Sequence, residues 1–171
     1  MVSGYANCGK PDKAVGLYNR MLESESEVPN GFMYSAVLIP CGLLGDLRTG
    51  KLIHERICGE RLELDTVLMN NLLDMYFKCG SLIDARRVFD DISSKNTTTW
   101  HTLVSGFTEA GLMEEAVSLF HQMKEPSVVS WNSIIGGFAD NGSSAAFEFV
   151  CIMHREGLMC TWLICIQIAM N

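Results

Sequence analysis

Residues 100–123, WHTLVSGFTEAGLMEEAVSLFHQM, decide the fold of this chain, because they read as two short helices folded back on each other. In the first half, Leu103, Val104 and Phe107 are spaced so that all three lie on one helical face. Gly111 then interrupts the pattern at the place where a tight or left-handed turn is needed. After it, the apolar spacing resumes at Ala116, Val117, Phe120 and Met123. The segment predicts a helical hairpin.

The same hairpin pattern occurs five times, with intervals of 36, 35, 31 and 31 residues between successive turn glycines. These glycines are Gly9, Gly45, Gly80, Gly111 and Gly142. Three further columns recur in phase with them: small residues at Ala14, Gly50, Ala85, Ala116 and Ala146; apolar helix ends at Met21, Ile57, Ile92, Met123 and Met153; and Tyr5, Cys41, Tyr76, Phe107 and Phe138 four residues before each glycine. Repeats of this length predict an all-α solenoid of helix-turn-helix repeats in a right-handed superhelix, in which neighbours bury each other's apolar faces.

The composition of the chain is that of a folded protein, and its net charge limits the kinds of partner it can bind tightly. Of the 171 residues, 48% are hydrophobic and 19% are charged, which is typical of a globular domain. The net charge of −7 disfavours tight binding of a polyanion. The seven cysteines show no paired spacing, which indicates reduced structural cysteines in an intracellular compartment. The longest apolar run, residues 158–170, is too short to span a bilayer, so we expect no membrane insertion.

The columns divide the chain into five repeats and a tail. The predicted boundaries are 1–30 for a truncated repeat, 31–65 for a long one, 66–96 and 97–127 for two short ones, and 128–161 for the fifth. Met1 falls in the middle of a repeat, which indicates a fragment or a shortened sequence. The tail, residues 162–171, is an apolar partial repeat or an aberrant end without a neighbour, and it predicts self-association.

Two places should depart from the regular hairpin. Pro40 lies inside the first helix of the second repeat and is expected to kink or shorten it, because proline removes a helical hydrogen bond. In the fifth repeat the segment after Gly142 is one residue short, so its second helix is expected to start differently.

The columns resemble the pentatricopeptide repeat over essentially the whole chain, with the pattern W-N-x-x-I-x-G-[FY]-x-x-x-G-x-x-x-x-A-x-x-x-F-x-x-M. The alternation of 35-residue and 31-residue repeats resembles the long-and-short subclass of land plants. Residues 45–54, GDLRTGKLIH, are similar to its long repeat, and residues 75–85, MYFKCGSLIDA, are similar to its short repeat. Tetratricopeptide repeats are the nearest rival, but their tryptophan and proline markers sit elsewhere.

The resemblance implies binding of single-stranded RNA, about one base per repeat, for RNA processing or editing in mitochondria or chloroplasts. In the family, the fifth and the last residue of a repeat together read a base edge. A residue three positions before the first reader wedges between bases, and a lysine near the end of the first helix meets phosphate. The implied RNA-binding residues are Val67, Asn70, Lys78 and Asn96 in the third repeat, Val129, Asn132 and Thr161 in the fifth, and Ser35 and Asp65 in the second.

The third repeat alone keeps every one of these roles, and in the family a pair of asparagines such as Asn70 and Asn96 prefers a pyrimidine. The fifth repeat has Asp140 where a lysine would help. The fourth departs in every role, because the corresponding residues are Thr98, His101, Ser127 and Glu109. We therefore expect weak RNA binding by the isolated chain.

Two alternatives remain open from the sequence. Asn70 and Asn132 begin their predicted helices, so each could cap a helix instead of reading a base. The acidic net charge and the apolar tail also suit a protein-binding solenoid scaffold, or a non-functional fragment of a longer repeat protein. Other RNA-processing proteins are further candidate partners.

Catalysis is not expected from this chain. Residues 154–156, HRE, match the first half of a zinc deaminase signature, but Cys160 and Cys165 are too far apart and lack the proline of the second half. The sequence has no nucleophile motif, no glycine-rich phosphate loop and no metal-ligand spacing among His54, His101 and His121. We expect no enzymatic activity, no cofactor and no metal.

Overall fold

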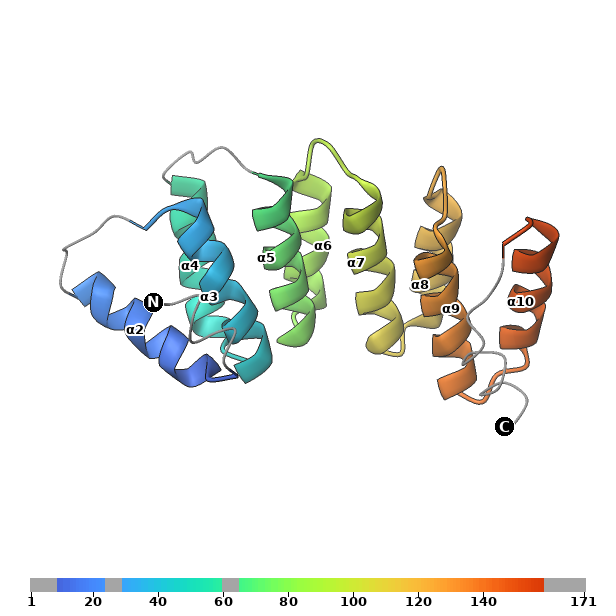
Figure 1. Cartoon of the computed structure of the whole chain (residues 1–171), viewed down its shortest axis with the longest axis horizontal. Coiled ribbons are helices and arrows are strands. Elements are labelled where there is room, and N and C mark those ends of the chain that lie inside the picture. Colours follow the sequence, from blue (N-terminus) through green and yellow to red (C-terminus); the bar gives the residue numbers. More distant parts are fainter. Residues whose placement is uncertain (1–8, 24–28, 60–64, 159–171) are drawn as a thin grey trace. The chain divides into compact units, whose positions relative to one another are not determined.

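The computed structural model describes residues 9–23, 29–59 and 65–158, and every regular element in these ranges is an α-helix (Figure 1). This confirms the predicted all-α fold class. Thr161 and the apolar tail, residues 162–171, lie outside the described residues. None of the described helices is both long enough and apolar enough to cross a membrane. The helices are α2 (Pro11–Glu23), α3 (Gly31–Leu44), α4 (Leu47–Gly59), α5 (Thr66–Lys78), α6 (Leu82–Asp91), α7 (Thr97–Glu109), α8 (Met113–Gln122), α9 (Val128–Asp140) and α10 (Ala145–Arg155).

The helices pack in two compact units, Met1–Ser94 and Lys95–Asn171, which we call the N-terminal and the C-terminal unit. In the N-terminal unit α3 lies beside α5, α4 packs against both, α2 packs on α3 and α6 on α5 (Figure 1). In the C-terminal unit α7 lies beside α9, α8 packs against both and α10 packs on α9. Within each unit the first helices of successive repeats are therefore neighbours, and the second helix between them contacts both. This is the hairpin stacking that the repeat columns predict.

The turn glycines adopt the left-handed conformation that their position predicts. Gly9, Gly45, Gly80, Gly111 and Gly142 have φ angles between 63° and 76°. At the Gly111 turn, the amide of Leu112 donates to the carbonyl of Phe107 at 2.9 Å, and the turns at Gly45, Gly80 and Gly142 carry the equivalent bond. Such a bond from the residue after the glycine closes the end of the first helix. The column of aromatic residues and cysteine therefore marks the carbonyl that accepts this bond.

α3 continues through Pro40 to Leu44, so the expected shortening of this helix is wrong. The physical reason is burial on both sides of the proline. Tyr34, Leu38 and Cys41 are completely buried, and this packing holds a helix whose backbone has lost one hydrogen bond. Burial also raises the pKa of the Cys41 thiol to about 12, so the side chain packs as a small apolar group.

The second helix of the fifth repeat does start differently, as the sequence predicts. α10 begins at Ala145, three residues after Gly142, whereas the other second helices begin two residues after their glycine. Its first turn is tight, because the amides of Ala146 and Phe147 donate to carbonyls only three residues back, at 3.2 and 3.1 Å.

Small residues let the helices approach closely at two kinds of place. The predicted alanine column is completely buried at Ala14, Ala85 and Ala116. A second close approach, which the columns do not mark, lies between α7 and α9 at Gly137. A Cβ atom built on Gly137 would collide with the Cγ2 of Thr108 and lie 2.9 Å from the Sδ of Met113. The two first helices of the C-terminal unit therefore need a glycine at this position.

This contact predicts opposite effects for two adjacent glycines of α9. Gly137→Ala should lower the free energy of unfolding by about 1–3 kcal/mol, because the β-branched Thr108 cannot move away without shifting α7. Gly136→Ala is the matched control, since no atom lies within 4 Å of a Cβ built there. It should stabilise the helix by about 0.5–1 kcal/mol. Urea unfolding followed by far-UV circular dichroism measures both changes, and equal effects for the two variants would contradict the packing argument.

Candidate nucleic-acid interface

Four side chains of the third repeat lie along one face of α5, and we call them the α5 row. They are Val67, Asn70, Asp74 and Lys78, which follow one another at intervals of three or four residues. Three of them are the residues that the resemblance assigns to RNA binding. The fourth, Asp74, holds the lysine: its Oδ2 lies 2.7 Å from the Nζ of Lys78. Lys78 is therefore ion-paired along its own helix.

The predicted wedge residues are large apolar side chains that the fold leaves exposed. Val67 of α5 and Val129 of α9 are 58% and 54% exposed, and Phe32, at the equivalent position of α3, is 77% exposed. Each is the second residue of its helix. Aliphatic and aromatic side chains at such positions can pack on the faces of unstacked bases.

Asn70 and Asn132 do not cap their helices, so the cap alternative is wrong for both. α5 begins four residues before Asn70 and is capped by Asp65, and α9 begins four residues before Asn132 and is capped by Ser127. In the part of the chain that the structure describes, the Oδ1 atoms of Asn70 and Asn132 are buried and accept no hydrogen bond. A buried acceptor without a donor costs about 1–3 kcal/mol. Both asparagines are half-buried as residues, with the oxygen end of each amide turned inward.

The caps of the first helices belong instead to the last residue of the preceding repeat. Asn30, Asp65, Asn96 and Ser127 each accept a hydrogen bond from a backbone amide in the first turn of α3, α5, α7 and α9. Asn96 is bound most firmly, because its Oδ1 accepts from the amide of Thr99 at 2.9 Å and from its hydroxyl at 3.0 Å. The oxygen of this amide is thus occupied. Its Nδ2 donates to none of the described residues and remains available as a donor.

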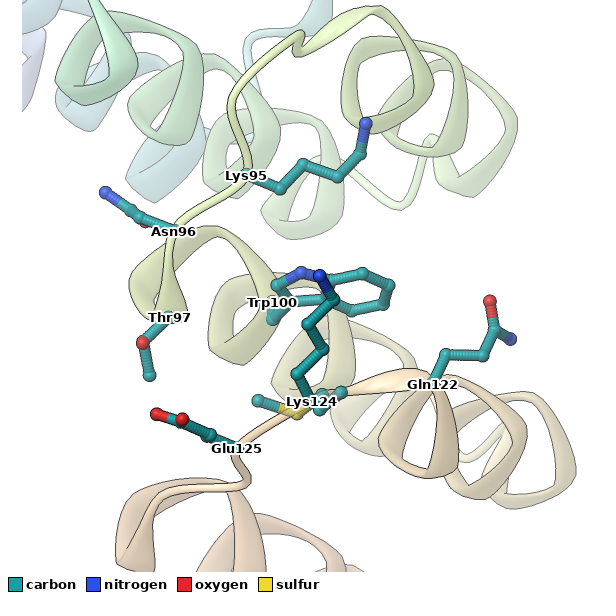
Figure 2. Close-up of a pocket in the computed structure, with 8 residues that line it drawn as sticks. Lys95, Asn96, Thr97, Trp100, Gln122, Lys124 and Glu125 are labelled. Carbon is teal, nitrogen blue, oxygen red and sulfur yellow. The ribbon is translucent and has the colours of Figure 1, made fainter.

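An open pocket of about 340 Å³ lies beside Asn96 at the start of α7 (Figure 2). Lys95, Trp100 and Lys124 contribute to its lining. Figure 2 shows the amide of Asn96 pointing away from the indole of Trp100. A base in contact with the free end of Asn96 would therefore not stack on this indole.

A second open pocket, of about 410 Å³, lies between α7 and α9 and includes Asn132 in its lining. Glu109 and Asp140 also line it, at the positions where the resemblance expects a phosphate-binding lysine. Two carboxylates repel a phosphate, so this groove offers Asn132 for base contact without a cation beside it.

His101, the fifth residue of the fourth repeat, already has a partner in the neighbouring helix. Its Nε2 lies 3.3 Å from the hydroxyl of Ser133, which itself donates to the carbonyl of Val129 at 3.1 Å. The Nε2–H tautomer of His101 satisfies both bonds. Burial lowers the pKa of His101 against the opposing effect of Glu109, so the ring is neutral at neutral pH. His101 therefore has a hydrogen-bond partner within the chain, whereas the Oδ1 atoms of Asn70 and Asn132 have none.

The predicted base-reading pairs are distributed over the chain as follows. Ser35 of α3 and Asp65 both belong to the N-terminal unit. Asn70 belongs to the N-terminal unit and Asn96 to the C-terminal unit. Thr161, the predicted partner of Asn132, lies outside the described residues. The cap role of the last-residue column escaped the sequence reasoning, and so did the pairing of Asp74 with Lys78, although opposite charges four residues apart on a helix signal it.

Among the described residues, no three His, Cys, Asp or Glu side chains are grouped so that they could hold a metal ion. His154, from the partial deaminase match, is exposed in the last turn of α10. Cys160 and Cys165 lie outside the described residues.

The two hydrogen bonds that Asn96 accepts from Thr99 predict a stabilising role for Asn96. Asn96→Ala should lower the free energy of unfolding by about 0.5–2 kcal/mol, because the helix loses its cap and the buried Thr99 hydroxyl loses its acceptor. Asn96→Ser should recover most of this loss, since serine is also a good cap. The control is Thr98→Ala, which changes an exposed residue of the same turn. Thermal unfolding of the four proteins tests this, and an unchanged midpoint for Asn96→Ala would contradict it.

Comparisons with known proteins agree with these columns. The family described as "PPR repeat" matches residues 1–26, 67–97, 98–127 and 129–158. The pentatricopeptide repeat-containing protein At4g08210 of Arabidopsis thaliana is 60% identical over 159 residues, which are 93% of this chain and 23% of that protein. Two further Arabidopsis pentatricopeptide repeat-containing proteins, one named as mitochondrial and one as chloroplastic, are each 36% identical over 106 residues. These residues are 62% of this chain and 15% and 20% of those proteins, so the chain spans less than a quarter of each relative.

Among solved structures, pentatricopeptide repeat protein PPR10 in complex with an 18-nt psaJ RNA element is similar, with a TM-score of 0.84 and 20% identity. The similarity covers 98% of this chain and 26% of that one, which comes from maize. The likeness supports the predicted solenoid fold. Because the family matches well over half of the residues, this chain belongs to the pentatricopeptide repeat family.

Proposed function

We propose that this chain is a sequence-specific single-stranded RNA-binding module of the long-and-short subclass. It acts in RNA processing or editing in a plant mitochondrion or chloroplast and has no catalysis of its own. The family membership and the organelle labels of the relatives support this proposal. So does the RNA in the complex of the similar maize protein. The activity, targets and partners are part of the proposal, because the chain spans less than a quarter of its relatives.

The observation that carries the proposal is the pair of buried amide oxygens without a donor. Asn70 and Asn132 occupy the fifth position of two repeats, and neither oxygen is satisfied by the described chain. A folded protein gains nothing from such groups by themselves, since alanine at either position would favour the helix more. Each asparagine is only half-buried, so a rotation of its amide would turn this oxygen toward the N–H donors of a base edge.

The flanking residues fit the same ligand. Val67 and Val129 are exposed one turn before each asparagine and would pack on base faces. Asn96, the last residue of the third repeat, offers its Nδ2 donor while its oxygen stays bound to Thr99. An acceptor oxygen such as the O2 of a pyrimidine would meet this donor, in agreement with the pyrimidine preference of such a pair in the family.

Charge limits the affinity of the proposed complex. The C-terminal unit has three basic side chains, Lys95, Lys124 and Arg155, and seven acidic ones. Phosphate contacts from lysine and arginine supply most of the sequence-independent affinity for nucleic acids. The affinity of this chain must therefore come mainly from base contacts, and the rest of a longer protein would add to it.

A protein-binding scaffold is the second candidate, and α3 favours it. Phe32, Ile39 and Leu43 follow one another along this helix and are 77%, 43% and 62% exposed. Ile39 and Leu43 correspond to Asp74 and Lys78 of the α5 row, whereas Phe32 corresponds to Val67 and Ser35 to Asn70. An apolar row of this kind suits contact with a protein better than contact with RNA.

The Asn70→Ala variant separates RNA reading from a structural role. Losing one base-edge hydrogen bond of about 1 kcal/mol should weaken RNA binding about fivefold and relax the preference at a single nucleotide. The melting temperature should stay the same or rise, because the substitution removes an unsatisfied buried oxygen. Fluorescence anisotropy with unstructured RNAs that differ at single positions measures the first effect, and circular dichroism the second.

Asn19→Ala is the matched control, because Asn19 is exposed on α2, a second helix outside the proposed interface. It should change neither the affinity nor the preference. A wild-type chain that binds single-stranded RNA no better than a duplex at low salt would refute the RNA proposal and favour the scaffold. An unchanged nucleotide preference in Asn70→Ala would refute the assignment of Asn70 alone.

A further inference from the structure

Lys78 is held at both its stem and its charged end. The stem packs against α3, where a Cβ atom built on Gly42 would lie 3.1 Å from the Cδ and 3.3 Å from the Cβ of Lys78. The ammonium group forms its 2.7 Å ion pair with Asp74, and both side chains are 39% exposed. The lysine is therefore directed along the α5 row, next to a carboxylate that lies between it and Asn70.

We propose that Asp74 competes with RNA phosphate for Lys78 and thereby sets the strength of RNA binding by the third repeat. This inference rests on the proposed function, because it assumes that RNA lies along the α5 row. A phosphate that approaches Lys78 must displace the carboxylate or share the ammonium with it. In either case the phosphate gains less from Lys78 than it would from an unpaired ammonium, because the carboxylate already satisfies part of that charge.

The first helices of the fourth and fifth repeats support this assignment through the same two positions. On α7 the corresponding residues are Ser105 and Glu109, and the serine hydroxyl donates to the carboxylate at 3.1 Å. On α9 they are Gly136 and Asp140. Each of the three helices thus keeps one carboxylate on this face. Of these three residue pairs, only Asp74 and Lys78 combine a carboxylate with a lysine, so Asp74 is the carboxylate of this set whose removal would release a lysine for phosphate.

The ion pair between Asp74 and Lys78 is weak enough for a phosphate to displace the carboxylate, so Asp74 would modulate RNA affinity without abolishing it. Exposed ion pairs at this helical spacing contribute little, because water and salt screen them. Asp74→Asn, which keeps the shape of the side chain, should therefore tighten RNA binding by roughly two- to fivefold. Affinity should also become more sensitive to salt, with the slope of log K against log salt rising in magnitude by up to about 0.7, the value for one full phosphate contact to a single strand.

Asp90→Asn is the control for net charge. Asp90 pairs with Arg86 at 3.3 Å with the same spacing of four residues, but on α6, a second helix outside the row. This variant changes the total charge by the same amount and breaks an equivalent exposed ion pair. It should leave RNA affinity within about 1.5-fold of wild type, as expected for a rim charge. Melting curves of both variants show whether either substitution disturbs the fold.

A double-mutant cycle with Lys78→Ala completes the test, with all four proteins measured as the 171-residue chain by anisotropy at low and moderate salt. The gain from Asp74→Asn should vanish when Lys78 is absent, because the carboxylate then has no cation to compete for. Three results overturn the inference while the wild-type chain still binds RNA: no gain in Asp74→Asn, an equal gain in Asp90→Asn, or a gain that survives Lys78→Ala. A loss of affinity in Asp74→Asn overturns it too, since Asp74 would then orient Lys78 for phosphate. Failure of every protein to bind RNA overturns the proposed function and this inference together.

Discussion

The left-handed glycine at each hairpin turn is the constraint on which the rest of this structure depends. At φ angles near those of Gly80 and Gly111, 71° and 76°, other L-residues are strained by about 1–2 kcal/mol. The same turn lets the next amide bond back to the helix, so the two helices of a hairpin meet in one register. Because the hairpins at Gly45, Gly80, Gly111 and Gly142 are closed in the same way, equivalent positions recur on equivalent faces of α3, α5, α7 and α9. The repeated interface is a consequence of the repeated turn.

At the opposite end of each first helix, one short polar side chain serves two demands. The helix start needs an acceptor for its free amides, and Asn, Asp and Ser are the side chains that supply one at least cost. Asn30, Asp65, Asn96 and Ser127 all come from this set. In the proposed complex the same side chains face a base with whatever atom the cap leaves free. For Asn96 that atom is a donor, because the cap has fixed which end of the amide points inward. The fold of the chain thus determines whether this side chain would offer a hydrogen-bond donor or an acceptor to a base.

The repeats could be predicted because each column is a separate physical requirement that recurs in phase: a left-handed turn, a close helix contact, a buried helix end. Local details that depend on tertiary context could not. Asn70 looked like a helix start in the sequence, but Asp65 caps α5 and places Asn70 in its second turn. Pro40 was expected to kink or shorten its helix, but α3 continues through it to Leu44 among the buried Tyr34, Leu38 and Cys41. The sequence does not reveal that the oxygens of Asn70 and Asn132 lack a hydrogen-bond donor, because this depends on how the neighbouring helices pack around them.

The two parts of the proposed interface, the α5 row and the pocket between α7 and α9, differ in their charged side chains. On α5 a cation exists but is paired with Asp74, and in the pocket between α7 and α9 two carboxylates stand where a cation would be. Neither surface attracts phosphate strongly, so long-range attraction contributes little to RNA binding at physiological salt. What remains are short-range contacts: exposed Val67 and Val129 against base faces, and unsatisfied amide oxygens against base edges. Such contacts discriminate between bases more than they attract a polyanion. In the proposed complex, a repeat array of this kind would gain its affinity by adding repeats, and this chain spans less than a quarter of its relatives.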